Sequence, residues 1–254
     1  MIQKYHYSNI LPRLNKHFLG FYLDERLVGV VTLGWGTRPL HTIQKIFPSL
    51  KTEDYYEIGR MCMSEDMPRN SESQMLSQTI KWIKNNCPDI KVLFTWADGM
   101  VGKPGYVYQG SNFYYLGYIW TDMYMKNGIK LHPRQTKQFF SQDSKDKRLT
   151  CRPTFEQQEA GIQHYKGKQF KYLFFTCNKR EKKRLMKECN EMLSRKYPKE
   201  DDLEWKIQVG KGKWEKCERP PYLTDMNSES ENLIGLVKKQ KNLCRQQDDL
   251  YRKK

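Results

Sequence analysis

The sequence predicts an α+β fold in which a mixed central sheet is flanked by helices and followed by a basic C-terminal extension. Short apolar runs with strand character recur along the chain, and an amphipathic helix stands between two of them. That strand–helix–strand order implies a parallel crossover within the sheet. From residue 200 on the apolar pattern weakens, and Lys and Arg are frequent in the second half of the chain.

The first three predicted elements are strands. Residues 18–23 and 27–33 are apolar and are separated by the polar residues 24–26, which is typical of a hairpin. Residues 34–52 contain glycines and prolines and are expected to form a loop. Residues 55–63 then predict a third strand.

A helix and more strands follow. Residues 71–86 place apolar side chains at helical spacing, and residues 90–96 form an apolar run that predicts a buried strand. A glycine-rich loop at 98–105 leads to a short helical turn at 107–112. An aromatic strand is expected over 113–125.

The second half is predicted less sharply. Residues 131–165 are polar and read as an irregular insertion, and residues 171–176 predict a strand. Residues 181–196 have the pattern of a basic amphipathic helix. These elements give two expected parts: a domain built on the sheet over 1–177 and a basic, helical extension over 178–254, whose end is expected to be poorly ordered.

The charge is strongly positive and unevenly distributed. The 254 residues include 45 Lys and Arg against 29 Asp and Glu, a formal net charge of +16. Residues 1–130 hold 15 basic and 11 acidic residues (net +4), and residues 131–254 hold 30 and 18 (net +12). Such a surface attracts polyanions, so we expect contact with nucleic acid, with the phosphates held mainly by residues 179–195.

Several classes of protein are disfavoured by composition. No run approaches the ~20 apolar residues of a membrane-spanning helix, and the first residues have no apolar signal core. The seven Cys form no CxxC pair, which argues against a disulfide framework and a thiolate zinc site. The expected location is the cytoplasm.

The loop before the predicted helix is a candidate anion site. Residues 68–73 (PRNSES) lead into the helix start, where free backbone N–H groups and the helix dipole favour an anion. An Arg and small hydroxyls suit a pyrophosphate. Most capped helices share this pattern, so it has little weight by itself.

Residues 106–113 combine a short helix carrying a Tyr with an aromatic strand start, and Gly117 follows. This segment resembles the acyl-CoA-binding motif of the GNAT fold, which implies a splayed central sheet. Six segments, in order and at compatible spacings, are more specific: His6-Tyr7-Ser8, Leu27-Val28-Gly29-Val30-Val31, Glu57-Ile58-Gly59-Arg60, Pro68-Arg69-Asn70-Ser71-Glu72-Ser73, Trp96-Ala97-Asp98 and Val107-Tyr108-Gln109. Together they resemble the phage Mom family, a GNAT offshoot, over residues 3–120.

The resemblance implies a function. Mom proteins install a methylcarbamoyl group on the N6 amine of adenine in duplex DNA, which protects phage DNA from host restriction. The family is associated with acetyl-CoA and with bound iron. By match, the iron ligands would be His6, Tyr7 and Asp98, a mixed N/O set compatible with non-haem iron. The host cytoplasm of an infected bacterium would be the site of action.

The resemblance also implies catalytic and cofactor-binding residues. Arg60 would hold a phosphate or a carbonyl, Ser73 would face the pyrophosphate, and Tyr108 would protonate a leaving thiolate. Asp98 would bind the metal or accept a proton. The full cofactor-binding set is Arg69, Asn70, Ser71, Ser73, Tyr108 and Asn112.

Ordinary structural roles remain open for the same residues. Arg60 could pair with Glu57 inside the sheet, Tyr108 could be a packed aromatic, and Asp98 could be a turn residue before Gly99. Two other functions also remain open: a GNAT N-acyltransferase acting on a small amine or a protein, and an inert DNA-binding module on a GNAT scaffold.

Overall fold

The computed structural model describes residues 14–126, 128–131, 161–210 and 212–220. His6 and Tyr7 therefore lie outside the described residues, as does most of the 131–165 insertion. The chain divides into two compact units, which we describe separately. The first comprises residues 1–120 and 168–203, and the second comprises residues 121–167 and 204–254.

The first unit begins with the predicted hairpin. Strands β1 (Leu14–Leu23) and β2 (Arg26–Trp35) pair in antiparallel fashion, and Asp24 adopts a left-handed φ of 52° in the turn. β3 (Tyr55–Met63) pairs antiparallel with β2 and confirms the third predicted strand. The Trp35 indole N–H lies 2.8 Å from the carbonyl oxygen of Thr52 and 2.9 Å from that of Tyr55, which ties the end of β2 to the start of β3.

The expectation of a loop over residues 34–52 was wrong. Helix α2 (Pro39–Ile46) forms there, with Pro39 in its first turn and Ile43 and Ile46 buried. It spans eight residues, too few for helical periodicity to stand out from the flanking Gly and Pro. The short 3-10 helix η1 (Thr52–Asp54) follows it.

The strand–helix–strand step is present as predicted. Helix α3 (Ser71–Asn86) connects β3 to β4 (Val92–Asp98), and these two strands are parallel. The 3-10 helix η2 (Gly99–Val101) and helix α4 (Tyr106–Gly110) then lead to β5 (Tyr114–Lys126).

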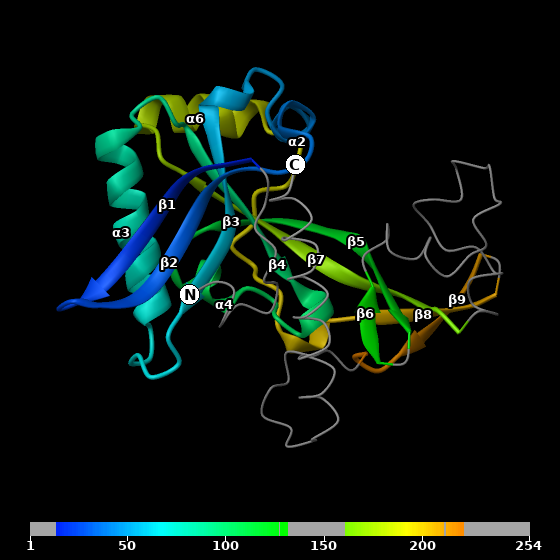
Figure 1. The fold of residues 1–254 in the computed structure, drawn as a ribbon. Helices are drawn as coiled ribbons and strands as arrows, with labels where there is room; N and C mark the ends of the chain where they lie inside the picture. The colour runs from blue at the N-terminus through cyan, green and yellow to red at the C-terminus, as the bar shows by residue number, and fades with distance from the viewer. Residues whose placement is uncertain (1–13, 127, 132–160, 211, 221–254) are drawn as a thin grey trace, which may run out of the picture. The chain divides into compact units, whose positions relative to one another are not determined.

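β3 and β4 pair over only three residues. Tyr55, Tyr56 and Glu57 lie opposite Val92, Leu93 and Phe94, and the ladder then ends although both strands continue. On its other edge, β4 pairs along its whole length with β7 (Gln163–Phe175), antiparallel, from Val92↔Phe175 to Asp98↔Gln169. The strand order in this unit is β1-β2-β3-β4-β7-β5, and Figure 1 shows β3 and β4 diverging.

The divergence begins where β3 carries an extra residue. Leu33 of β2 lies opposite Ile58, whereas the preceding Thr32 lies opposite Arg60, so Gly59 is the extra residue of a bulge. Bulges bend a strand and increase its local twist. The bend follows the last pair with β4 directly, which accounts for the short parallel ladder.

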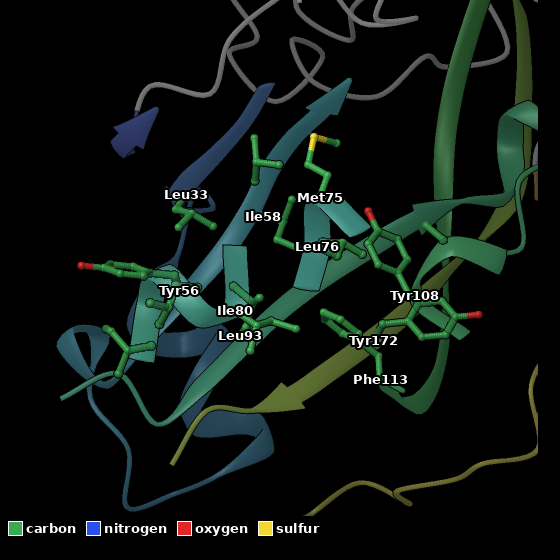
Figure 2. Close-up of a cluster of buried hydrophobic side chains, with 14 of the residues drawn as sticks. Leu33, Tyr56, Ile58, Met75, Leu76, Ile80, Leu93, Tyr108, Phe113 and Tyr172 are labelled. Carbon is green, nitrogen blue, oxygen red and sulfur yellow. The ribbon is translucent and has the colours of Figure 1, made fainter. Parts of the chain in front are cut away.

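Two apolar clusters cover the two faces of the sheet in the first unit. On one face, α3 contributes Leu76 and Ile80 against Tyr56, Ile58 and Leu93 of the strands. Figure 2 shows this cluster, with Tyr108 and Tyr172 side by side at its α4 end. We call this the α3 face.

The opposite face carries α2 and the basic helix. Ile43 and Ile46 of α2 pack with Tyr55 and Phe94 of the strands, and Leu185 comes from α6 (Lys179–Glu188). We call this the α2 face. The predicted basic helix thus ends at Glu188, earlier than residue 196, and a loop containing η5 (Glu200–Asp202) follows.

The second unit is built from strands. The end of β5 pairs with β6 (Ile129–Leu131), and the start of β7 pairs with β8 (Trp205–Gly210), which pairs with β9 (Lys213–Cys217). The two strands β8 and β9 occupy a segment for which the sequence predicted helix. Each ring nitrogen of buried His164 lies 2.8 Å from a side-chain oxygen, of Asp122 or Gln208.

No helix in the described part of the chain is long and apolar enough to cross a membrane.

Candidate active site

The predicted anion loop folds back on itself at the start of α3. Asn70 takes the N-cap position with a left-handed φ of 73°, and its side chain makes no capping hydrogen bond. The Ser71 hydroxyl is buried and donates to the Pro68 carbonyl at 2.7 Å. Arg69 is exposed. The hydroxyl of Ser71 therefore closes the turn, whereas Arg69 is available to a ligand from solvent.

A groove of about 410 Å³ lies between α3 and the α4–β5 turn. Ser73 faces α4, since its Oγ lies 3.6 Å from the position that a Cβ on Gly110 would take. Asn112 lines the opposite wall with a left-handed φ of 61°. The structure thus brings together two residues of the predicted cofactor set, Ser73 and Asn112.

Three polar residues of α3 that line the groove were missed by the sequence analysis. Ser77, Lys81 and Lys84 extend the wall that begins at Ser73. Ser73, Ser77 and Lys81 are spaced four residues apart, so they share one face of α3. That spacing is visible in the sequence and could have identified them. Two lysines beside two hydroxyls make a wall suited to phosphate groups.

Tyr108 is buried on the α3 face. Its ring packs against Phe113 and Tyr172, at centroid distances of 5.5 and 5.4 Å. Burial raises the pKa of its hydroxyl, and a hydrogen bond with Thr95 of β4 opposes that shift. The phenol therefore stays protonated near neutral pH and can donate a proton. Thr95 directly follows Phe94, the last β4 residue paired with β3.

The α2 face carries a different set of polar side chains. Successive side chains of a strand alternate between faces, and Phe94 belongs to the cluster on the α2 face. Trp96 and Asp98 therefore share that face, on which Trp96 packs beside the cluster. The register places Glu57 there as well.

Arg60 joins this set because of the bulge. Because Gly59 is an extra residue, the Arg60 side chain lies on the same face of the sheet as that of Thr32, its partner in β2. This face is the α2 face. The Arg60 Nη1 donates to the Gly59 carbonyl at 2.7 Å. Of the predicted catalytic residues, Arg60 and Asp98 thus lie on the α2 face, and Ser73 and Tyr108 lie on the α3 side.

Glu57 has the most perturbed carboxyl described in the structure. Burial raises its pKa from 4.5 to about 7, against the opposing effects of a hydrogen bond from the Gly36 backbone N–H and the positive charge of Arg60. The sequence analysis gave Glu57 only a role as a partner of Arg60. The strand pattern gave no indication of its burial.

Asp98 ends β4 and caps η2. Its Oδ1 accepts the Met100 N–H at 3.1 Å, so the capping role expected of a turn residue is present. The next position requires glycine, because a Cβ at Gly99 would lie 2.4 Å from the carbonyl oxygen of Lys168. Within the described ranges, no group of three His, Cys, Asp or Glu could hold a metal ion. Of the three expected iron ligands, Asp98 alone falls within those ranges.

The basic helix α6 lies at the other end of β4. Lys91, which precedes β4, pairs with Asp54 and approaches Glu181 of α6. β4 spans seven residues, so Asp98 is ~20 Å from its first residue at ~3.3 Å a step. The lysines of α6 are thus well separated from the predicted catalytic carboxylate.

Comparison with known proteins identifies one family. A model of the Mom protein family matches residues 1–199. The methylcarbamoylase Mom of Escherichia phage Mu is 30% identical to this chain over 185 residues, which covers 73% of each protein. Every candidate residue named above lies within the matched range.

The pKa of Glu57 predicts a pH-dependent stability. A carboxyl whose pKa is higher in the folded than in the unfolded state stabilises the fold below pH ~4.5 and loses that contribution as the pH rises to about 7. The free energy of unfolding of Glu57→Gln, minus that of wild type, should therefore be about 3 kcal/mol larger at pH 8 than at pH 4. Urea unfolding at the two pH values measures this.

The matched control is Glu53→Gln, which removes an exposed carboxyl of η1. Its stability relative to wild type should not change with pH. Equal pH dependence in both variants would contradict the burial of Glu57.

Proposed function

This chain belongs to the Mom protein family, and from that premise we propose that it is a transferase that modifies the N6 amine of adenine in duplex phage DNA. The observation that carries the proposal is the parting of β3 from β4 after Glu57, with polar groups on both faces. A donor and an acceptor could meet there from opposite sides of the sheet.

We propose acetyl-CoA as the donor. A parallel strand pair that parts after three residues is the arrangement expected of a GNAT-like fold. The groove beside α3 offers Ser73, Ser77, Lys81 and Lys84 to the phosphates of CoA, and Tyr108 lies beyond it as a proton donor. The volume of the groove is in the range of known small-molecule sites, roughly 300–1,000 Å³.

The identity of the transferred group follows from chemistry. The name of the phage Mu relative specifies a methylcarbamoyl group, which contains a nitrogen atom that an acetyl group lacks. Acetyl-CoA alone can therefore supply only an acetyl group, and a methylcarbamoyl product requires a nitrogen source. We propose N6-(methylcarbamoyl)adenine or a related acyl derivative as the product, with protection from host restriction as its effect.

Iron remains part of this proposal through the family resemblance. A carboxylate oxygen is a ligand that iron accepts, so Asp98 fits chemically, with His6 and Tyr7 as the other expected ligands. When bound, iron would supply an electrophilic centre at the carboxyl end of β4. Asp98 itself holds the start of η2 through its bond to the Met100 N–H.

DNA has to present a base that is normally paired. N6 of adenine lies inside the duplex, so extrusion of the base is expected, at a cost of a few kcal/mol. On the α2 face, the partly buried ring of Trp96 offers a surface on which an extruded base could stack. Beyond it, the exposed residues Lys179, Lys183 and Lys187 of α6 share one helix face and suit a phosphate backbone.

The first test is nucleoside mass spectrometry on plasmid DNA from cells that express the protein. Wild type should yield a heavier deoxyadenosine whose mass identifies the group. Asp98→Ala should reduce its amount at least ~100-fold, because it removes the carboxylate proposed to bind the metal or to accept a proton. Unmodified DNA from soluble wild-type protein would favour an N-acyltransferase for other amines, and full modification by Asp98→Ala would remove Asp98 from the site.

The groove is tested by binding of acetyl-CoA. Lys81→Ala/Lys84→Ala should weaken binding about tenfold or more, because two charged hydrogen bonds to phosphate are lost. Isothermal titration calorimetry with acetyl-CoA measures this. Lys81→Arg/Lys84→Arg is the matched control and should retain most of the affinity. Equal binding by all three proteins would place the phosphates elsewhere.

The α6 lysines are tested by salt-dependent binding to duplex DNA. Lys179→Ala/Lys183→Ala/Lys187→Ala should flatten the plot of log K against log salt by about 0.9 for each lost phosphate contact, up to ~2.7 in all. Fluorescence anisotropy with a labelled duplex measures the slope. The corresponding Lys→Arg triple variant should retain the wild-type slope, and an unchanged slope in the Ala variant would exclude α6 from the interface.

A further inference from the structure

Three lysines form a row across the strands of the second unit. The first residues of β7 lie beside β8, and β8 lies beside β9 (Figure 1). The register pairs Lys166 with Lys206, and Lys206 with Lys216. Directly paired residues carry their side chains on the same face of a sheet. Adjacent strands are ~4.8 Å apart, so the row of three lysines spans ~10 Å of one face. We call these residues the lysine row.

The lysine row opposes the pairing of its own strands. Like charges that lie directly opposite each other in a sheet are destabilising. Glu204 offsets part of this effect, since its Oε1 lies 3.3 Å from the Lys206 Nζ. Within the described ranges, Lys166 and Lys216 form no ion pair. An anion bound to the row would therefore relieve a repulsion that the free protein has to bear.

Aromatic and buried groups hold one end of the row in place. Trp214 pairs with Gln208 and lies two residues before Lys216, so its ring is on the face of the row. The Lys166 Nζ lies 4.1 Å from the centre of this ring, which is a cation–π contact. Buried His164 makes a T-shaped contact with the same ring at a centroid distance of 4.8 Å. The position of the Lys166 ammonium group is thus set by its neighbours.

We propose that the lysine row binds the phosphate backbone of duplex DNA, as a contact of the second unit in addition to that of α6 in the first. This inference rests on the proposed function, in which duplex DNA is the substrate. One DNA strand carries a phosphate per ~3.4 Å of helix axis, so a row of ~10 Å faces about three phosphates. Contacts to phosphate carry no sequence information. The lysine row therefore holds the duplex without selecting the base to be modified.

The family resemblance assigns no role to this surface. The Mom family model ends at residue 199, and Lys206, Trp214 and Lys216 lie beyond it. The row is formed by the register of three strands, and Lys166 is 40 residues from its partner Lys206 along the chain. Residues 131–254 carry a net charge of +12. The register gathers part of that charge on one face of the sheet.

The test measures the binding of a fluorescently labelled DNA duplex to the full-length protein over a series of salt concentrations. Lys166→Gln/Lys206→Gln/Lys216→Gln removes three charges and keeps polar side chains. It should flatten the plot of log K against log salt by about 0.9 for each lost phosphate contact, up to ~2.7 in all. The triple Lys→Arg variant at the same positions should retain the wild-type slope, because it keeps the charges.

Two single variants control for net charge and folding. Lys213 and Lys216 are both exposed in β9, but Lys213 directly precedes Trp214 and therefore lies on the opposite face. Lys216→Gln should flatten the slope by about 0.9, and Lys213→Gln should leave it unchanged.

The outcomes separate this inference from the proposed function. If wild type binds the duplex, and the triple Gln variant keeps its slope or the two single variants behave alike, the lysine row does not contact DNA and the proposed function stands. If wild type does not bind duplex DNA even at low salt, the proposed function fails, and this inference fails with it.

Discussion

The site depends on one constraint, the end of the β3–β4 ladder at Glu57 and Phe94, while β4 stays paired with β7 along its other edge. A strand in the middle of a sheet needs hydrogen-bond partners on both sides, and unpaired buried backbone groups are costly. β3 and β4 nevertheless end their ladder after three pairs, where the bulge at Gly59 bends β3 away from β4. The opening that results gives side chains on both faces access to one point in the sheet.

The two faces at this opening differ in chemistry because of strand alternation. Thr95 and Tyr108 place hydroxyl groups on the α3 face, the side of the sheet on which the groove lined by Ser73 and the α3 lysines also lies. Glu57, Arg60 and Asp98 place charged groups on the α2 face. A bound donor and an arriving amine could thus be kept apart until they meet at the opening, which is how a sheet of this kind can serve a bisubstrate transfer.

The acidic groups of the α2 face also bear on how a polyanion could approach. Glu57 and Asp98 would repel phosphates, whereas Arg60 and the lysines of α6 would attract them. Since α6 approaches Lys91, at the opposite end of β4 from Asp98, it would hold the DNA backbone away from the reacting base. That separation is compatible with a base extruded from the duplex toward the opening. The net charge of +12 in residues 131–254 would add to that attraction.

The sequence by itself determined the local elements of the first unit and the family. Hairpin, crossover helix and aromatic strand each have a periodicity or turn signal that depends only on neighbouring residues, and they were found where predicted. The six motifs gave the Mom resemblance that the comparisons bear out. Short α2 was missed because eight residues hold too little periodicity, and β8 because one of its partners lies some 40 residues away in β7. β9 depends in turn on β8, with which it pairs.

Only the tertiary structure decided which residues share a face and which groups are perturbed. The groove joins α3 to the α4–β5 turn, and Ser77, Lys81 and Lys84 acquire a role only when Gly110 and Asn112 lie opposite them. Glu57 looks in the sequence like an ordinary strand carboxylate. Its pKa of about 7 comes from burial, beside the Gly36 backbone, at the end of a ladder. Burial and cross-strand contact depend on residues far apart in the chain, and no local pattern contains that information.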